Sequence, residues 1–139
     1  KVFEVLGERD GKPYGYGKIV KLDEPMTVTS FVELVKGAFD VTSVRYTDGE
    51  NMIKKFAVCS GAGGSNVPIA VEKNCDAYVT GDCKHNQFID AKNAGLTLID
   101  AGHFHTERIF APILCKKLKK HFDIEISVAE NDCDPCKYL

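Results

Sequence analysis

Leu98-Ile99-Asp100-Ala101-Gly102-His103-Phe104-His105-Thr106-Glu107 begins as an apolar run and ends in side chains that can bind metal. A short apolar run that stops at glycine is typical of a buried strand. Thr106 is suited to cap a helix that begins there, and Glu107 then lies in the first turn, where a carboxylate is favoured. The stretch therefore predicts a strand, a loop and a helix in succession, which is the repeating unit of an α/β fold.

Two similar units lie immediately upstream. We expect strands at Ile53–Cys59, Asp76–Thr80 and Leu96–Ala101. The segments between them are a glycine-rich loop at Ser60–Asn66, a helix at Ser65–Lys73, a loop at Gly81–Lys84 and a helix at His85–Ala94. Strands that alternate with helices form right-handed crossovers and a parallel sheet. Because the carboxyl ends of parallel strands share one edge, Ser60, Asp82 and His103 are predicted to lie together.

The flanking segments complete the predicted α/β domain, a mostly parallel sheet with flanking helices. Before the repeated units we expect a strand at Gly15–Leu22, an amphipathic helix at Thr27–Phe39 and a strand at Val41–Tyr46. After them we expect a helix at Thr106–Phe122, a last strand at Ile124–Val128 and an irregular tail at Asn131–Leu139.

Length and composition indicate one globular domain over residues 1–139. The net charge of −2 gives no reason to expect a nucleic-acid or membrane partner. No apolar run reaches the length of a membrane span, and the charged amino terminus is unlike a signal peptide, so we expect a cytoplasmic protein. The chain has no initiator Met and opens on strand-like residues. We therefore expect it to be part of a longer protein.

The six cysteines do not follow the pattern of a disulfide scaffold. Cys59, Cys75, Cys83 and Cys115 lie in or beside predicted strands and helices, so we expect buried free thiols in a reducing compartment. Only Cys133 and Cys136 have a redox or metal spacing. A redox pair normally opens a helix after a strand, and a zinc site needs a second such pair. The role of this pair stays open.

His103 and Glu107 are the primary candidates for metal ligands. They are four residues apart and share a face if the segment is helical. Imidazole and carboxylate together suit zinc, iron, manganese or nickel. The alternative is a surface loop with solvated histidines.

Three further features could carry chemistry. The loop containing Ser60, Gly61, Gly63, Gly64 and Ser65 follows a strand and precedes a helix, so its amides could bind a phosphate. The alternative is a tight turn that needs glycine. Asp82 could orient a ligand, act as a general base or cap the next helix. His85 opens that helix and is the second catalytic candidate, or else a surface residue.

The chain resembles the carboxy-terminal portion of the GTP cyclohydrolase 1 type 2 homologues, also called Nif-three-like dinuclear metal-centre proteins. The resemblance covers nearly all of the chain. It is carried by Gly15-Tyr16-Gly17-Lys18-Ile19, Ala57-Val58-Cys59-Ser60-Gly61-Ala62-Gly63-Gly64-Ser65, Asp76-Ala77-Tyr78-Val79-Thr80-Gly81-Asp82-Cys83-Lys84, Asp90-Ala91-Lys92, Asp100-Ala101-Gly102-His103-Phe104-His105-Thr106-Glu107 and Asp134-Pro135.

The resemblance implies a Nif-three-like carboxy-terminal lobe in which His103 and Glu107 bind a centre of two divalent metal ions, with zinc, iron, manganese, nickel or magnesium as the possible metals. It gives His105 no such role. The family's other ligands, a His pair and an Asp, come from an amino-terminal half that this sequence lacks. Asn86 stands where members have a His after the Thr-Gly-Asp segment, so only His85 could substitute.

The family name implies hydrolytic opening of a GTP-like purine ring, hence a metal-dependent hydrolase with a nucleotide-like substrate. The resemblance also implies a homo-oligomer in the form of a hexameric ring. The alternative is a non-enzymatic module that binds metal or another protein, because two ligands are fewer than the three of catalytic zinc sites.

Overall fold

The computed structural model describes residues 1–137. Its centre is a six-stranded sheet in the order β1-β2-β4-β5-β6-β3. The strands are β1 (Val2–Arg9), β2 (Lys12–Met26), β3 (Arg45–Tyr46), β4 (Ile53–Val58), β5 (Ala77–Thr80) and β6 (Thr97–Asp100). The helices are α1 (Val28–Phe39), α2 (Val67–Glu72), α3 (His85–Asn93), α4 (His103–Arg108) and α5 (Phe110–Leu118), and the 3-10 helix η1 (Gly64–Asn66) precedes α2. The last two residues of the predicted tail lie outside the described part.

The central strands β4, β5 and β6 are parallel, as predicted. The prediction of a mostly parallel sheet is wrong, because β1, β2 and β3 all pair antiparallel. A tight turn at Asp10 and Gly11, both with positive φ, folds β1 onto β2 as a hairpin. A hairpin forces antiparallel pairing, whereas parallel pairing needs a crossover helix. The sheet is therefore mixed, with its parallel part at the centre.

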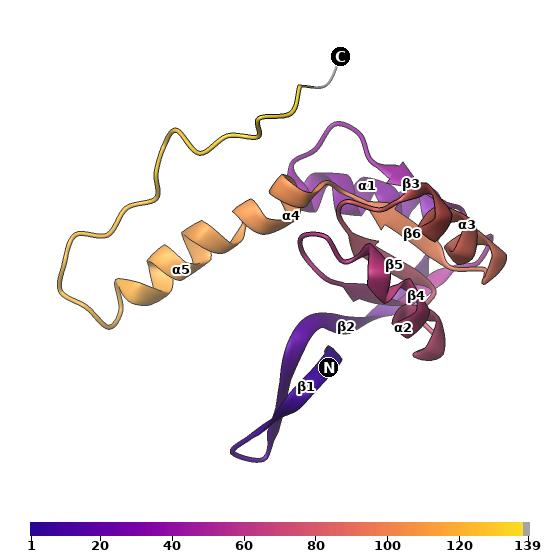
Figure 1. Cartoon of the computed structure of the whole chain (residues 1–139), viewed down its shortest axis with the longest axis horizontal. Coiled ribbons are helices and arrows are strands. Elements are labelled where there is room, and N and C mark those ends of the chain that lie inside the picture. The colour runs from indigo at the N-terminus through magenta and orange to yellow at the C-terminus, as the bar shows by residue number, and fades with distance from the viewer. Residues whose placement is uncertain (138–139) are drawn as a thin grey trace.

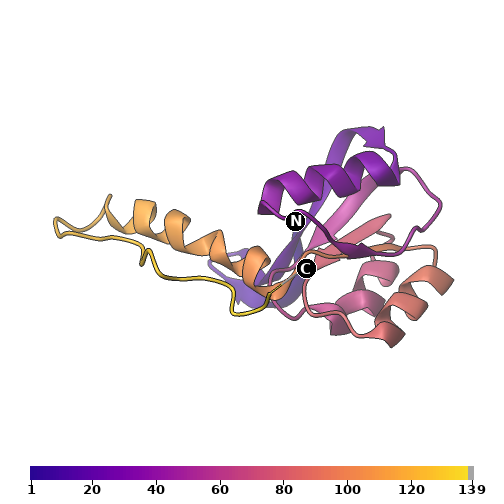
Figure 2. The ribbon, with the colours of Figure 1, turned by 90° about the horizontal axis from the view of Figure 1, so that it is seen from above.

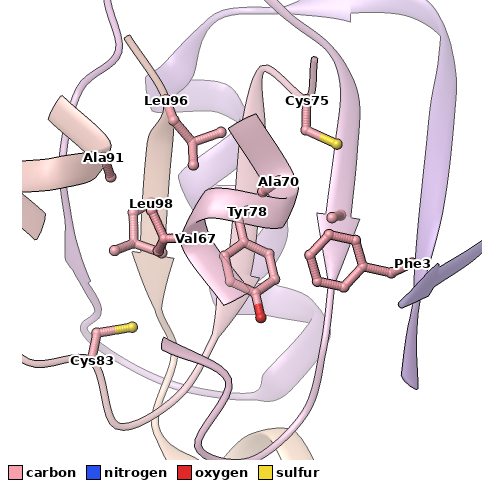
Figure 3. Close-up of a cluster of buried hydrophobic side chains, with 10 residues drawn as sticks. Phe3, Val67, Ala70, Cys75, Tyr78, Cys83, Ala91, Leu96 and Leu98 are labelled. Atoms are coloured by element: carbon pink, nitrogen blue, oxygen red, sulfur yellow. The ribbon is translucent and has the colours of Figure 1, made fainter. Parts of the chain in front are cut away.

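Helices cover both faces of the sheet (Figure 2). Thr27 accepts a hydrogen bond from the Ser30 amide at 3.2 Å and so caps α1, and Phe31 and Val35 pack with Val79 and Ile99 on one face. On each strand, the residue before Val79 or Ile99 points to the other face of the sheet. There Tyr78 and Leu98 pack with Phe3 and with α2 and α3 (Figure 3).

Several predicted boundaries are wrong. The strand predicted at Gly15–Leu22 is longer, and the one predicted at Val41–Tyr46 is reduced to Arg45–Tyr46. The helix predicted at Ser65–Lys73 is shortened to Val67–Glu72, because Ser65 lies in the 3-10 turn η1. The helix predicted from Thr106 begins at His103 and ends before Phe122, as α4 and α5. Within residues 1–137 the segment Ile124–Val128 forms no strand.

Helix α5 leads away from the sheet, and the segment after it turns and runs back toward α4 (Figure 1). None of the residues of α5 is buried, and Phe110 and Ile113 are 62% and 60% exposed. Among residues 1–137, no helix has both the length and the apolar character that crossing a bilayer requires. The six cysteines are free thiols in the structure.

Asp100 joins the loop after β5 to the loop after β6. Its side chain is 5% exposed and accepts hydrogen bonds from the Cys83 amide at 3.0 Å and the Gly102 amide at 3.0 Å. Arg45 on β3 forms an ion pair with the same carboxylate and also donates to the Cys83 carbonyl at 2.9 Å. A buried charge with this many donors is fully compensated, so its removal leaves several groups unpaired.

We predict that Asp100→Asn lowers the free energy of unfolding by about 3 kcal/mol, because the amide nitrogen would meet donors where the carboxylate accepts. Urea denaturation would measure the loss. Asp23→Asn, at an exposed position on β2, is the matched control and should change stability by less than about 0.5 kcal/mol. Equal effects of the two variants would contradict the role assigned to Asp100.

Candidate metal site

The three loops that follow the parallel strands meet at one edge of the sheet, as the sequence predicted. The Gly61 amide donates to the Thr106 hydroxyl at 2.9 Å, and the Gly81 amide donates to the Gly61 carbonyl at 2.9 Å. Asp82 lies 2.7 Å from His103. These contacts bring together residues that are between 20 and 45 positions apart in the chain.

His103 is held between two carboxylates. Its Nδ1 lies 2.7 Å from Asp82 Oδ2, and its Nε2 lies 3.2 Å from Glu107 Oε2. The second contact is the four-residue spacing on α4 that the sequence predicted. All three side chains are about half exposed. The pair His103 and Glu107 therefore faces solvent, while Asp82 holds the far side of the ring.

The two carboxylates change the acid–base properties of the imidazole. The hydrogen bond to Asp82 is the main cause that raises the pKa of His103 above 6.5, and the charge of Glu107 adds to it. A neutral ring could donate to only one of the two carboxylates, whereas the imidazolium satisfies both. A positive charge between Nε2 and Glu107 is thus favoured, whether a proton or a cation supplies it.

Gly61 leaves space for this pair of side chains. Its φ is +71°, a conformation that favours glycine, and an added Cβ would lie 2.3 Å from Glu107 Oε1 and 3.4 Å from His103 Nε2. Any other residue would fill the space in front of His103 and Glu107. The glycine-rich loop therefore serves the site by leaving it open.

The amides of that loop are largely used within the fold. Gly61 donates to Thr106, and Gly63 donates to the Thr80 hydroxyl at 3.0 Å, while Tyr78 donates to the Gly63 carbonyl at 2.8 Å. Phosphate binding by this loop stays a prediction, and it falls chiefly to Ser60, Gly64 and Ser65. Gly64 itself packs against α3, where an added Cβ would lie 2.2 Å from the Gln87 side chain.

The sequence suggested that Thr106 caps a helix, and this prediction is wrong because the helix α4 begins three residues earlier, at His103. It is 1% exposed inside α4, and its hydroxyl donates to the His103 carbonyl at 2.9 Å while accepting from Gly61. One buried hydroxyl thus joins the glycine-rich loop to the helix of His103. The sequence could not reveal this link, because a threonine near the start of a predicted helix is equally typical of a helix cap.

His85 and His105 lie apart from the pair. His85 is the exposed first residue of α3, and within residues 1–137 no hydrogen bond or ion pair joins it to Asp82 or His103. His105 Nε2 lies 3.6 Å from Asp134 Oδ2 in the carboxy-terminal tail. Cys136 in that tail is exposed, and its amide donates to Asp134 at 2.9 Å.

The thiols nearest the loops are unsuited to metal binding or nucleophilic chemistry. Burial raises the pKa of the Cys83 thiol to about 12 and also raises the pKa of Cys59. A thiol with a raised pKa is protonated at neutral pH and is a poor ligand and nucleophile. Cys83 instead uses its backbone amide, which binds Asp100.

The spacing of His103 Nε2 and Glu107 Oε2 fits the donor set of one metal ion. Nitrogen and oxygen ligands lie about 2.1 Å from zinc, which puts two of them about 3.4 Å apart in a tetrahedral site. The 3.2 Å between these atoms is close to that separation. The part of the chain that the structure describes holds no group of three or more His, Cys, Asp or Glu residues placed to bind a metal. Within residues 1–137, the site therefore presents two candidate ligands, His103 and Glu107.

The family model of Duf34/NIF3 (NGG1p interacting factor 3) matches residues 2–135. Among curated proteins, the GTP cyclohydrolase 1 type 2 homolog of Clostridium acetobutylicum is 33% identical over 133 residues, which cover 91% of this chain and 50% of that protein. The homolog of Bacillus subtilis is 36% identical over 131 residues, which cover 90% of this chain and 35% of that protein. The chain thus spans from about a third to half of these relatives.

Solved structures show the same fold. A crystal structure from Staphylococcus aureus superposes with a TM-score of 0.82 and 31% identity, covering 91% of this chain and 43% of that one. A Bacillus cereus protein described as related to NIF3 superposes with a TM-score of 0.78 and 31% identity, covering 93% of this chain and 37% of that one.

We predict that the His103 imidazole titrates above pH 6.5 and that Asp82→Asn lowers this midpoint. NMR of the ring protons in metal-free protein would measure both. A raised pKa means that protonated His103 stabilises the fold; this contribution is complete below pH 6.5 and is lost as pH rises through the raised pKa. Asp123→Asn is the control. A wild-type midpoint at or below 6.5 would contradict the geometry.

We also predict that Thr106→Val destabilises the protein by about 1–3 kcal/mol, because the Gly61 amide loses its buried acceptor while the shape of the side chain is kept. Thermal and urea denaturation would measure the change. Thr29→Val on the exposed side of α1 is the control. If both variants were equally stable, Thr106 would not be the link between loop and helix.

Proposed function

The chain belongs to the Duf34/NIF3 family, and we propose that it supplies His103 and Glu107 as ligands to a divalent metal centre of a metal-dependent hydrolase. The observation that carries this proposal is the 3.2 Å approach of His103 Nε2 to Glu107 Oε2, with Asp82 on the opposite ring nitrogen. A ligating histidine commonly has its second nitrogen held by a carboxylate in this way. The arrangement is thus that of a ligand pair with its supporting group.

Each side chain has a distinct part in this proposal. Asp82 accepts the Nδ1 proton, which fixes the tautomer and directs the Nε2 lone pair toward Glu107. Glu107 contributes negative charge, and its position at the open rim lets its free oxygen accept a proton from a bound water or substrate. Gly61 keeps the approach clear. A divalent cation would act there as a Lewis acid.

Acidity and metal binding are coupled at His103. A proton on His103 Nε2 and a cation would occupy the same position beside Glu107. Metal binding would therefore be accompanied by release of this proton. The raised pKa of His103 makes this exchange pH-dependent, with weaker metal binding as the pH falls through that pKa. This dependence follows from the same two carboxylates that favour the cation.

The reaction and substrate of the whole protein belong to the proposal as well. The names of the relatives suggest a GTP-like substrate, and hydrolysis is the chemistry that metal centres on histidine and carboxylate ligands commonly support. We infer a homo-oligomer and a further ligand-bearing part of the protein, because two ligands from this chain leave a metal ion incompletely coordinated. If no such part completes the coordination, the second candidate, a non-enzymatic metal-binding module, holds instead.

We predict that the protein, purified as its gene encodes it, contains bound divalent metal that His103→Ala and Glu107→Ala remove. His105→Ala is the matched control and retains the metal, because His105 faces Asp134. Asp82→Asn retains the ligands but weakens binding by about 10–100-fold. Elemental analysis of each variant after dialysis gives the content, and circular dichroism shows that each is folded.

Unchanged metal content in His103→Ala would remove the proposal. Chromatography of GTP incubated with the metal-loaded protein separates the two candidate functions. Loss of GTP that depends on His103 favours the hydrolase. Full metal occupancy with intact GTP and related nucleotides favours the binding module.

A further inference from the structure

An apolar cavity of about 520 Å³ opens next to Glu107. It lies between the end of β4, the end of α1 and the start of α5. Its apolar walls include Phe39, Val58, Phe110 and Ile113, and its polar groups include Lys18 and Glu107. Small-molecule sites are typically cavities of this size with apolar walls and a few polar groups.

The aromatic and aliphatic walls are exposed in the described structure. Phe110 and Ile113 are among the most exposed apolar side chains of the protein, although Phe39 across the cavity is 9% exposed. Exposed apolar groups that line a hollow, rather than scatter singly, mark a binding surface. The two phenylalanine rings suit a flat apolar body, because aromatic rings pack favourably by stacking or edge contacts.

Among residues 1–137, Lys18 supplies the one positive charge that lines the cavity. It lies on β2 opposite Val58 of β4, and none of the ion pairs within residues 1–137 includes it. Its ammonium group is therefore free to pair with an anion. Glu107 at the other side repels an anion, so the anionic group of a ligand belongs at the Lys18 end.

We propose that this cavity binds a small organic anion with a flat apolar body, its anionic group paired with Lys18 and its body against Phe39, Phe110 and Ile113. Resting on the proposed function, this inference restricts the proposed nucleotide-like substrate to one with a single anionic group, because the bound body would lie next to Glu107 and His103. A single lysine between apolar walls matches one anionic group better than a polyphosphate, which requires several cations or amides.

The test uses 1-anilinonaphthalene-8-sulfonate, a flat apolar body with one anionic group, and its uncharged analogue N-phenyl-1-naphthylamine. We expect saturable fluorescence enhancement by the sulfonate at one site. Lys18→Met should weaken sulfonate binding by about tenfold, the value of one charge-assisted contact, while binding of the uncharged analogue stays the same. Lys12→Met, at the start of β2 and outside the cavity, is the matched control and should change neither.

Ile113→Ser should weaken the binding of both compounds. Leu34→Ser replaces another exposed aliphatic side chain, on α1 outside the cavity, and should weaken the binding of neither. Equal sulfonate binding by wild type and Lys18→Met, or equal loss in Lys12→Met, would overturn the proposal. If sedimentation showed that the protein self-associates and that this association displaces the probe, the cavity would belong to a second copy of the chain. That result would also overturn the proposal. Metal content of Lys18→Met should be unchanged, so failure here is distinguishable from failure of the metal site.

Discussion

A single buried carboxylate sets the geometry on which the candidate site depends. Asp100 binds the amides of Cys83 and Gly102, so it holds together the loops after β5 and β6. Asp82 directly precedes Cys83, and His103 directly follows Gly102. The distance between imidazole and carboxylate is therefore fixed by a neighbour that does not belong to the pair. Arg45 compensates the buried charge and brings the short edge strand β3 into the same arrangement.

The sequence predicted the centre of the fold better than its edges. β5 and β6 are bounded by glycine or polar loops and are buried along their whole length, a pattern typical of central parallel strands. The segment Ile124–Val128 alternates as a strand would, yet forms none in the described structure. An alternating segment becomes a strand only where a sheet edge accepts its hydrogen bonds. Pairing at the edges depends on tertiary contacts, and periodicity does not encode them.

The site shows the same division between local and distant contacts. The spacing of His103 and Glu107 predicted their approach on one helical turn, and the order of strands predicted that Asp82 would lie nearby. Lys18 received no role from the sequence, because its contribution to the cavity requires β2 to pair beside β4. Thr106 was predicted to be a helix cap for a related reason, because its hydrogen-bond partner, the Gly61 amide, is 45 residues away in the chain.

Negative and positive side chains lie at opposite ends of the cavity and its neighbouring site, so each end favours a ligand group of opposite charge. Asp82 and Glu107 surround one imidazole, so that end favours a cation, either the proton of His103 or a metal ion. Lys18 lies across an apolar wall and favours an anion. A ligand with a charged group at one end and an apolar body cannot reverse in such a cavity without placing its charge against Glu107. For the proposed ligand, this separation of charge favours one orientation, in which the body rather than the anionic group lies toward His103.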